Sequence, residues 1–91
     1  MKHQKLNDFS KDNLIEIFLN AERKDGRLSL LEWDSLSIRT EVIFQFDKIL
    51  GKYYYSIQLD ELDKFTDKEI IDFALQGWIL NSDSTNIIKI C

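Results

Sequence analysis

Apolar residues recur every three or four positions in three stretches of the chain, the spacing that puts side chains on one face of an α-helix. In the first stretch, Leu14, Ile17 and Phe18 form such a stripe. Ser10 precedes it, and its hydroxyl suits a helix start because it can accept a hydrogen bond from a first-turn amide. The pattern therefore predicts a first helix over residues 11–23.

The strongest stripe follows Asp34 and Ser35, two residue types that are both preferred at helix caps. Gly51 closes the stripe, and a glycine commonly ends a helix. The pattern predicts a second helix over residues 35–50. Its apolar positions are Leu36, Ile38, Val42, Ile43, Phe46, Ile49 and Leu50.

Two shorter patterns lie downstream. Residues 59–65 fit a short third helix. Thr66 and Glu69 then have the spacing of a capping box, in which the first side chain bonds the amide three residues on and the second side chain bonds back. A fourth helix is expected to follow this box and to end at Gly77.

The remaining segments are interpreted as connections. Residues 28–33 are too apolar for a floppy linker and predict an ordered loop before the second helix. Residues 52–57 are β-prone, but no partner strand of similar quality is visible, so an extended connector is expected. The tails, residues 1–8 and 81–91, are expected to be peripheral to a core of about residues 9–77. The predicted fold is a single all-α domain, a small four-helix bundle with three longer helices and one short helix.

Composition limits the classes of function. The chain has 91 residues and a formal net charge of −4, which suits one small domain and argues against a nucleic-acid binder, because such a protein needs a basic face. The one cysteine, Cys91, and the one histidine, His3, stand at opposite ends, so no disulfide, zinc set or Cys–His catalytic pair is expected. No stretch is apolar for long enough to be a signal peptide or to span a membrane. We therefore expect a cytoplasmic monomer that performs no catalysis.

One short motif and a second element downstream resemble a known family. Asp34-Ser35-Leu36, at the expected start of the second helix, resembles the Asp-Ser-Leu attachment motif of acyl carrier and peptidyl carrier proteins. Residues 60–70 resemble the short third helix and Thr-capped fourth helix of the same family. The order and spacing of these elements agree with the family from about residue 9 to residue 77.

The resemblance implies a carrier function. In this family a phosphopantetheinyl transferase moves 4'-phosphopantetheine from coenzyme A to the motif serine, which would be Ser35. The thiol of this arm then holds an acyl or aminoacyl group as a thioester and carries it between loading and downstream biosynthetic enzymes. Asp34 and Leu36 match the flanking positions of the motif. A helix start at Ser35 would also favour the negative charge of the phosphodiester.

Further positions follow from the resemblance. The expected partner-binding residues are Leu36, Arg39, Glu41, Asp60 and Glu61. The expected acyl-chain pocket is formed by Val42, Phe46, Leu62 and Ile70. The pathway class would be fatty-acid or secondary-metabolite biosynthesis. Arg39 and Lys48 dilute the acidity that is usual for the family's second helix, and this favours a specialised pathway over a housekeeping one.

Other interpretations remain open at the level of the sequence. Ser35 could serve only as a helix cap, because serine is a common cap in any helical protein. Residues 21–32 have the outline of a calcium-binding loop, but Ala21 and Arg23 stand where oxygen ligands are required. The alternative function is a helical protein-interaction module without a prosthetic group, which binds through the acidic residues 60–72 or the tyrosines at 53–55.

Overall fold

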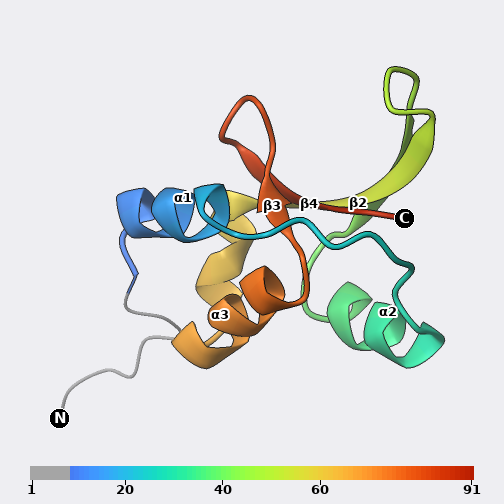
Figure 1. Cartoon of the computed structure of the whole chain (residues 1–91). Coiled ribbons are helices and arrows are strands. Elements are labelled where there is room, and N and C mark those ends of the chain that lie inside the picture. The colour runs from blue at the N-terminus through green and yellow to red at the C-terminus, as the bar shows by residue number, and fades with distance from the viewer. Residues whose placement is uncertain (1–8) are drawn as a thin grey trace, which may run out of the picture.

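Helices and strands are both present in the computed structural model, which describes residues 9–91 (Figure 1). The sheet has four strands in the order β1-β2-β4-β3, and all neighbouring strands are antiparallel. The elements in chain order are α1 (Lys11–Leu19), α2 (Leu30–Ser37), β1 (Ile43–Asp47), β2 (Lys52–Gln58), the 3₁₀ helix η1 (Leu59–Lys64), α3 (Asp67–Leu75), β3 (Ile79–Leu80) and β4 (Asn86–Ile90).

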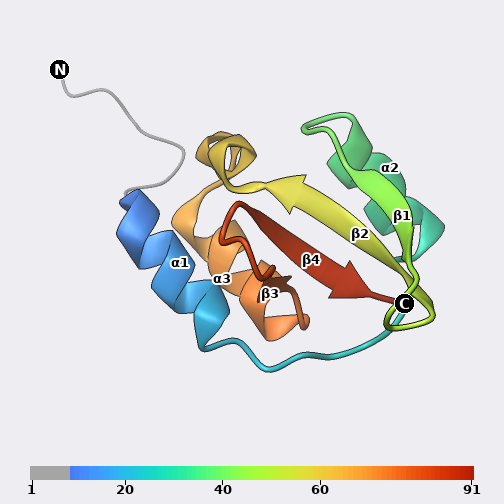
Figure 2. The same ribbon diagram turned by 90° about the horizontal axis from the view of Figure 1, so that it is seen from above.

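The helices cover one face of the sheet and leave the other face open. Figure 2 shows the sheet in front, with α2 behind β1 and with α3 beside β4 and partly behind β3. In the register of the sheet, Phe44 lies opposite Tyr55, and Ile57 lies opposite Ile87. Because side chains two residues apart on a strand share a face, these four side chains all point to the side of the helices.

The expected all-α four-helix bundle is wrong, because residues 43–58 form a β-hairpin. The residues predicted as the second half of a helix become β1, and the expected connector becomes its partner β2. Asp47 builds the turn: its Oδ1 accepts from the amides of Ile49 (2.8 Å) and Leu50 (3.0 Å). Gly51 closes the turn with a φ of 68°, which is natural for glycine.

Residues 43–47 fit the pattern of a strand as well as that of a helix. Phe44 and Phe46 are spaced so that they share one face of a strand, while their neighbours at 42 and 49 also fit a helical stripe. The aromatic and β-branched residues of this stretch favour strands once a partner is available. That partner lies across a tight turn, where Phe44 stacks on Tyr53 with ring centroids 5.0 Å apart.

Residues 86–90 also belong to the interior, although they were expected to be part of a peripheral tail. Asn86–Ile90 forms β4, which lies between β2 and β3, and Ile87 is completely buried. Asn81 shapes the turn before it, because its Oδ1 accepts from the amides of Thr85 (3.0 Å) and Asn86 (3.1 Å). The short apolar run has this role because it supplies the alternate buried positions of a central strand.

Three of the expected helices are present, with changed bounds. The first is α1, which Ser10 caps as predicted through the amide of Asn13 (3.2 Å), but which ends at Leu19. The short η1 and the following α3 stand where the third and fourth helices were expected. The capping box is confirmed: Thr66 Oγ1 accepts from the Glu69 amide (3.2 Å), and Glu69 Oε1 accepts from the Thr66 amide (2.9 Å).

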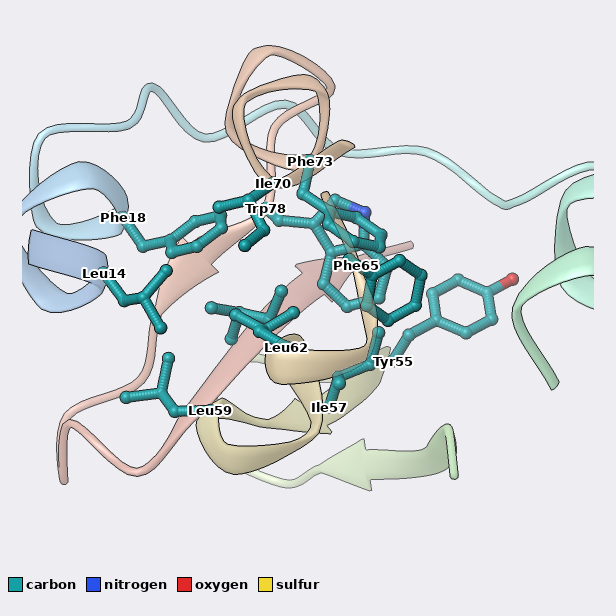
Figure 3. Close-up of a cluster of buried hydrophobic side chains, with 11 residues drawn as sticks. Leu14, Phe18, Tyr55, Ile57, Leu59, Leu62, Phe65, Ile70, Phe73 and Trp78 are labelled. Carbon is teal, nitrogen blue, oxygen red and sulfur yellow. The ribbon is translucent and has the colours of Figure 1, made fainter. Parts of the chain in front are cut away.

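The core fills the space between the sheet and α1, η1 and α3 (Figure 3). Phe73 is central to it and packs edge-on against Phe65 (centroids 5.1 Å apart) and Trp78 (5.5 Å). Each fully buried side chain of this size contributes about 1.5–3 kcal/mol relative to an exposed one. Side chains with less than 2% exposure are Trp78, Phe18, Phe65, Ile57, Leu62, Ile70 and Ile87.

An extended segment, residues 20–29, connects α1 to α2 along the edge of this core. The Gly26 amide donates to the Ile90 carbonyl (2.8 Å), which holds the segment beside β4. The buried Lys89 donates from Nζ to the carbonyls of Lys24 (2.9 Å) and Gln76 (2.8 Å). These bonds fix the point at which the chain enters α2.

Candidate functional site

Ser35 lies inside α2 and does not cap it. The helix begins at Leu30, five residues before its predicted start at residue 35, with Ser29 as its cap. The Ser29 hydroxyl accepts from the Glu32 amide (3.1 Å), and Glu32 Oε1 accepts from the Ser29 amide (2.8 Å), so this pair is a complete capping box. Ser35 is the sixth residue of the eight in α2, and its side chain is exposed.

A cleft runs between α2 and α3, beside Ser35. It has a volume of about 220 Å³. Phe65 and Phe73 contribute apolar surface, and Leu36 of α2 packs against the same core from the opposite side. The lining residues are Leu28, Glu32, Ser35, Leu36, Arg39, Phe65, Glu69, Asp72, Phe73 and Gln76.

Arg39 ties the end of α2 to the start of α3 across this cleft. Its guanidinium pairs with the Glu69 carboxylate at 2.5 and 3.1 Å and donates to the Lys64 carbonyl at 2.7 Å. The guanidinium also lies 4.2 Å from the centroid of the Phe65 ring. The bonds from Arg39, together with the Thr66 amide, lower the pKa of Glu69 to about 2. The Arg39 guanidinium is therefore already bound to groups of the same chain.

The surroundings of Ser35 do not fit a phosphodiester held at a helix start. The amides that would receive the phosphate belong to the first turn of a helix, and here that turn is capped by Ser29. Glu32 and Asp72 line the same cleft and would repel the phosphate. The cation of the cleft, Arg39, already binds a carboxylate. What the site does offer to an attached group is an exposed hydroxyl.

The expected partner-binding acids have mixed environments. Glu61 Oε1 accepts from the Thr40 hydroxyl (2.7 Å) and pairs with Lys64 Nζ (2.7 Å). The bonds from Lys64 and Thr40 lower the pKa of Glu61 to about 2. Asp60 and Glu41 are exposed, and the Glu41 amide lies 3.5 Å from Glu61 Oε1. Glu61 thus holds residues 40–41 against η1, while Asp60 remains at the surface.

The residues expected to form an acyl-chain pocket are dispersed. Leu62 and Ile70 are completely buried in the core, and Val42 packs against it. Phe46 lies on β1 and is half exposed. None of the four lines the cleft beside Ser35. They were expected to share one helix-lined space, and the formation of β1 separates them.

A second cavity, which the sequence did not indicate, lies between α2 and the hairpin. We call it the edge groove; its volume is about 280 Å³. Tyr55 lies between Trp33 and Phe44, with ring centroids 5.8 and 4.9 Å away, and its hydroxyl accepts from the Leu28 amide (3.2 Å). The lining residues are Arg27, Leu28, Leu30, Trp33, Phe44 and Tyr55. Trp33 could be anticipated as a packing anchor, but the groove depends on β1, which was not predicted.

Most of the exposed large apolar side chains belong to α2, to the hairpin and to the segment between them, and two of these, Leu30 and Phe44, line the groove. Eleven large apolar residues are exposed among the described residues, and eight of them lie between residues 30 and 53. We call these eight the hairpin–α2 surface. They are Leu30, Leu31, Ile38, Phe44, Phe46, Ile49, Leu50 and Tyr53.

The outer edge of β1 presents backbone groups that have no partner. Cys91 donates its amide to the Tyr53 carbonyl (2.9 Å), so the backbone groups of Tyr53 face β4. Alternate residues of an antiparallel strand bond to opposite neighbours, so those of Tyr54 face β1. Tyr54 pairs with the residue between Phe44 and Phe46, so the amides and carbonyls of these two phenylalanines point outward. No described residue forms a hydrogen bond with them.

The open face of the sheet carries a third, polar hollow of about 450 Å³. Its polar side chains are largely engaged with one another. The Tyr54 hydroxyl donates to Gln45 Oε1 (2.7 Å), and Asn86 Nδ2 donates to the Ser56 hydroxyl (2.9 Å). Tyr54, Gln45, Ser56 and Asn86 of this hollow are therefore already hydrogen-bonded within the chain.

No protein-family model, curated protein or solved structure matches the chain. Over residues 9–91, His, Cys, Asp and Glu side chains form no group that could hold a metal ion. No helix in this described part of the chain is long and apolar enough to cross a membrane. The cleft, the edge groove and the β1 edge are the features from which a function can be inferred.

Proposed function

We propose that the protein is a non-catalytic interaction module that binds a protein partner through the hairpin–α2 surface. The observation that carries this proposal is that eight of the eleven exposed large apolar residues in the described part of the chain lie in one segment, residues 30–53, which forms α2 and the hairpin. Single exposed apolar residues are normal, but a concentration of them marks an interaction surface. Aromatic residues are enriched in such surfaces, and this one contains Phe44, Phe46 and Tyr53.

The arrangement of these aromatic rings supports a binding role. Phe44 stacks on Tyr53 with an interplanar angle of 8°, and Phe46 meets Tyr53 edge-on. The rings are thus held in place by contacts with each other. Ordered side chains lose little conformational entropy when a partner covers them, which favours binding.

Photocrosslinking in an extract of the native cell tests this proposal. Benzoylphenylalanine replaces Phe46 in one variant and Leu19 in another. Leu19 is a matched control because it is exposed and apolar but lies on α1. We expect an adduct of defined mass with one protein from position 46 and none from position 19. Equal adducts from both positions, or none from position 46, would overturn the proposal.

The exposure of the Ser35 hydroxyl favours a second candidate, a carrier of a thioester on 4'-phosphopantetheine. Two features of the sequence support the carrier function: the Asp34-Ser35-Leu36 motif and the Thr66 capping box. The acidic cleft beside Ser35 and the position of Ser35 within α2 speak against it.

Intact mass separates the two candidates. The protein is incubated with coenzyme A, magnesium and a broad-specificity phosphopantetheinyl transferase, and its mass is measured. A carrier gains the mass of one arm, and Ser35→Ala gains none. Ser37→Ala is the matched control, because Ser37 is an exposed serine of the same helix. No adduct on the wild-type protein rules the carrier function out.

A further inference from the structure

We infer that the partner segment is an extended peptide that pairs with the outer edge of β1, places an apolar side chain in the edge groove and presents a carboxylate to Arg27. This inference rests on the proposed interaction function and names the chemistry of the partner. Three independent features of the described residues lead to it: the free backbone groups of β1, the shape of the groove and the charge at its rim.

The backbone of β1 provides the first feature. The outward amides and carbonyls of Phe44 and Phe46 are spaced as the hydrogen-bonding positions of a strand that lacks its neighbour. Such an edge readily accepts an extended segment from another chain, because each free group gains a hydrogen bond. The edge has no proline to block pairing, and β1 carries no lysine that would discourage it.

The edge groove provides the second feature. It lies on the helix side of the sheet, between α2 and the face of β1 that carries Phe44. Figure 2 shows α2 behind β1 at the outer end of the sheet, so an added strand would lie over this helix. The volume of about 280 Å³ is at the lower limit for a small-molecule pocket and suits one large side chain. Leu30, Trp33 and Tyr55 make the groove apolar.

Arg27 provides the third feature. It is exposed, it lines the groove, and it forms no ion pair within residues 9–91. The nearest acid in sequence, Asp25, is already paired with Arg23 (2.6 Å) and Lys52 (3.0 Å). A carboxylate on the bound segment would therefore complement Arg27. Because residues two apart on a strand share a face, the acid should stand two positions from the apolar anchor.

The same geometry disfavours a second copy of this chain as the occupant. In twofold pairing of β1 with another β1, the face turned toward the groove would carry Val42, Phe44, Phe46 and Lys48. This face offers a cation and no carboxylate to Arg27. An acidic peptide from a different protein satisfies both the groove and the charge.

Selection from a phage library of random peptides, long enough to span β1, tests the inference. Peptides that bind the full chain are expected to share an aromatic or large aliphatic residue two positions from Asp or Glu. Repeating the selection on Arg27→Glu should replace the acid by Lys or Arg. Lys68→Glu, with the same charge change at an exposed site on α3, should leave the selected sequences unchanged.

A pair of variants at one position tests strand pairing directly. Phe46→Pro removes one outward amide, and proline is tolerated at such a position of an edge strand. Phe46→Thr also removes the ring but keeps the amide and a β-favouring side chain. A selected peptide should bind Phe46→Pro about tenfold more weakly than Phe46→Thr, which corresponds to the loss of one hydrogen bond. Circular dichroism checks that both variants remain folded.

Three results would overturn the inference. The first is a selection that enriches no peptide over the uncoated surface, and the second is equal binding of the selected peptides to Arg27→Glu. The third is a dimer in sedimentation that Phe46→Pro abolishes, which would assign the edge to a second copy. An adduct from position 46 in the crosslinking experiment, combined with any of these, would leave the interaction function standing and reject only the peptide.

Discussion

The two ends of one face of the sheet differ in burial. Ile57 and Ile87, above α1, η1 and α3, are completely buried. Phe44 and Phe46 point to the same side of the sheet but are 41% and 51% exposed. The difference lies in what covers them, because only α2 lies behind the outer strand (Figure 2). One end of the sheet is stabilised within the chain, and the other keeps apolar surface for a partner.

The largest effect is expected from a comparison of one substitution in the core, on α3, with one in the turn of the hairpin. Ile70 is completely buried and Ile49 is 96% exposed. Ile70→Ala should lower the free energy of unfolding by about 2–5 kcal/mol, because it deletes core contacts and leaves a cavity. Ile49→Ala should change it by less than about 0.5 kcal/mol. Urea denaturation measures both, and equal losses would contradict the division into a core end and a binding end.

An intermediate effect is expected from the two capping boxes. Ser29→Ala and Thr66→Ala should each lower the free energy of unfolding by about 1 kcal/mol, since each removes a cap. Ser35→Ala should change it by less than about 0.5 kcal/mol, because Ser35 caps nothing. A loss at Ser35 larger than at Ser29 would mean that α2 begins where the sequence pattern first placed it. Thermal unfolding followed by circular dichroism is sufficient for the comparison.

The smallest effect concerns the ion pair that joins α2 to α3. The bonds from Arg39, together with that from the Thr66 amide, lower the pKa of Glu69 from its ordinary 4.5 to about 2. A carboxylate with a lowered folded-state pKa stabilises the fold above its unfolded pKa, and this contribution is lost as the pH falls from about 4.5 to about 2. Because the pair is partly exposed, the contribution should be below about 1 kcal/mol.

Denaturation at several pH values measures this contribution. The stability difference between the wild-type protein and Glu69→Gln should be present at neutral pH and should disappear toward pH 2. Asp63→Asn serves as the control, since Asp63 is an exposed acid of η1 that forms no ion pair within residues 9–91. A difference for Glu69→Gln that does not change with pH would show that Arg39 does not act through charge.

The helix starts that the sequence predicted correctly depend on interactions between residues close together in the chain. Ser10 and the pair Thr66 and Glu69 signal helix starts, because a cap needs only residues three positions apart. The Ser29 and Glu32 box has the same spacing and could have been found in the same way. The residues around Ser35 predict a competing helix start, because Asp34 and Ser35 are also preferred caps.

The hairpin and the edge groove, which the sequence did not predict, depend on contacts between distant residues. Residues 43–50 fit a helical stripe as well as a strand, and periodicity alone cannot choose between these structures in a short apolar run. The choice is made by pairing with β2 and, through β2, with β4. The edge groove requires all of these elements together, so no local pattern could have indicated it.

Residue-by-residue amide hydrogen exchange tests the central claim, that β1 is an edge strand with free outer backbone groups. The amides of Gln45 and Tyr54 face each other's strand and should be protected, whereas those of Phe44 and Phe46 should exchange rapidly. A bound peptide should then slow exchange at Phe44 and Phe46. Continuous protection from residue 43 to residue 50 would instead indicate a helix there and would contradict both the hairpin and the proposed binding edge.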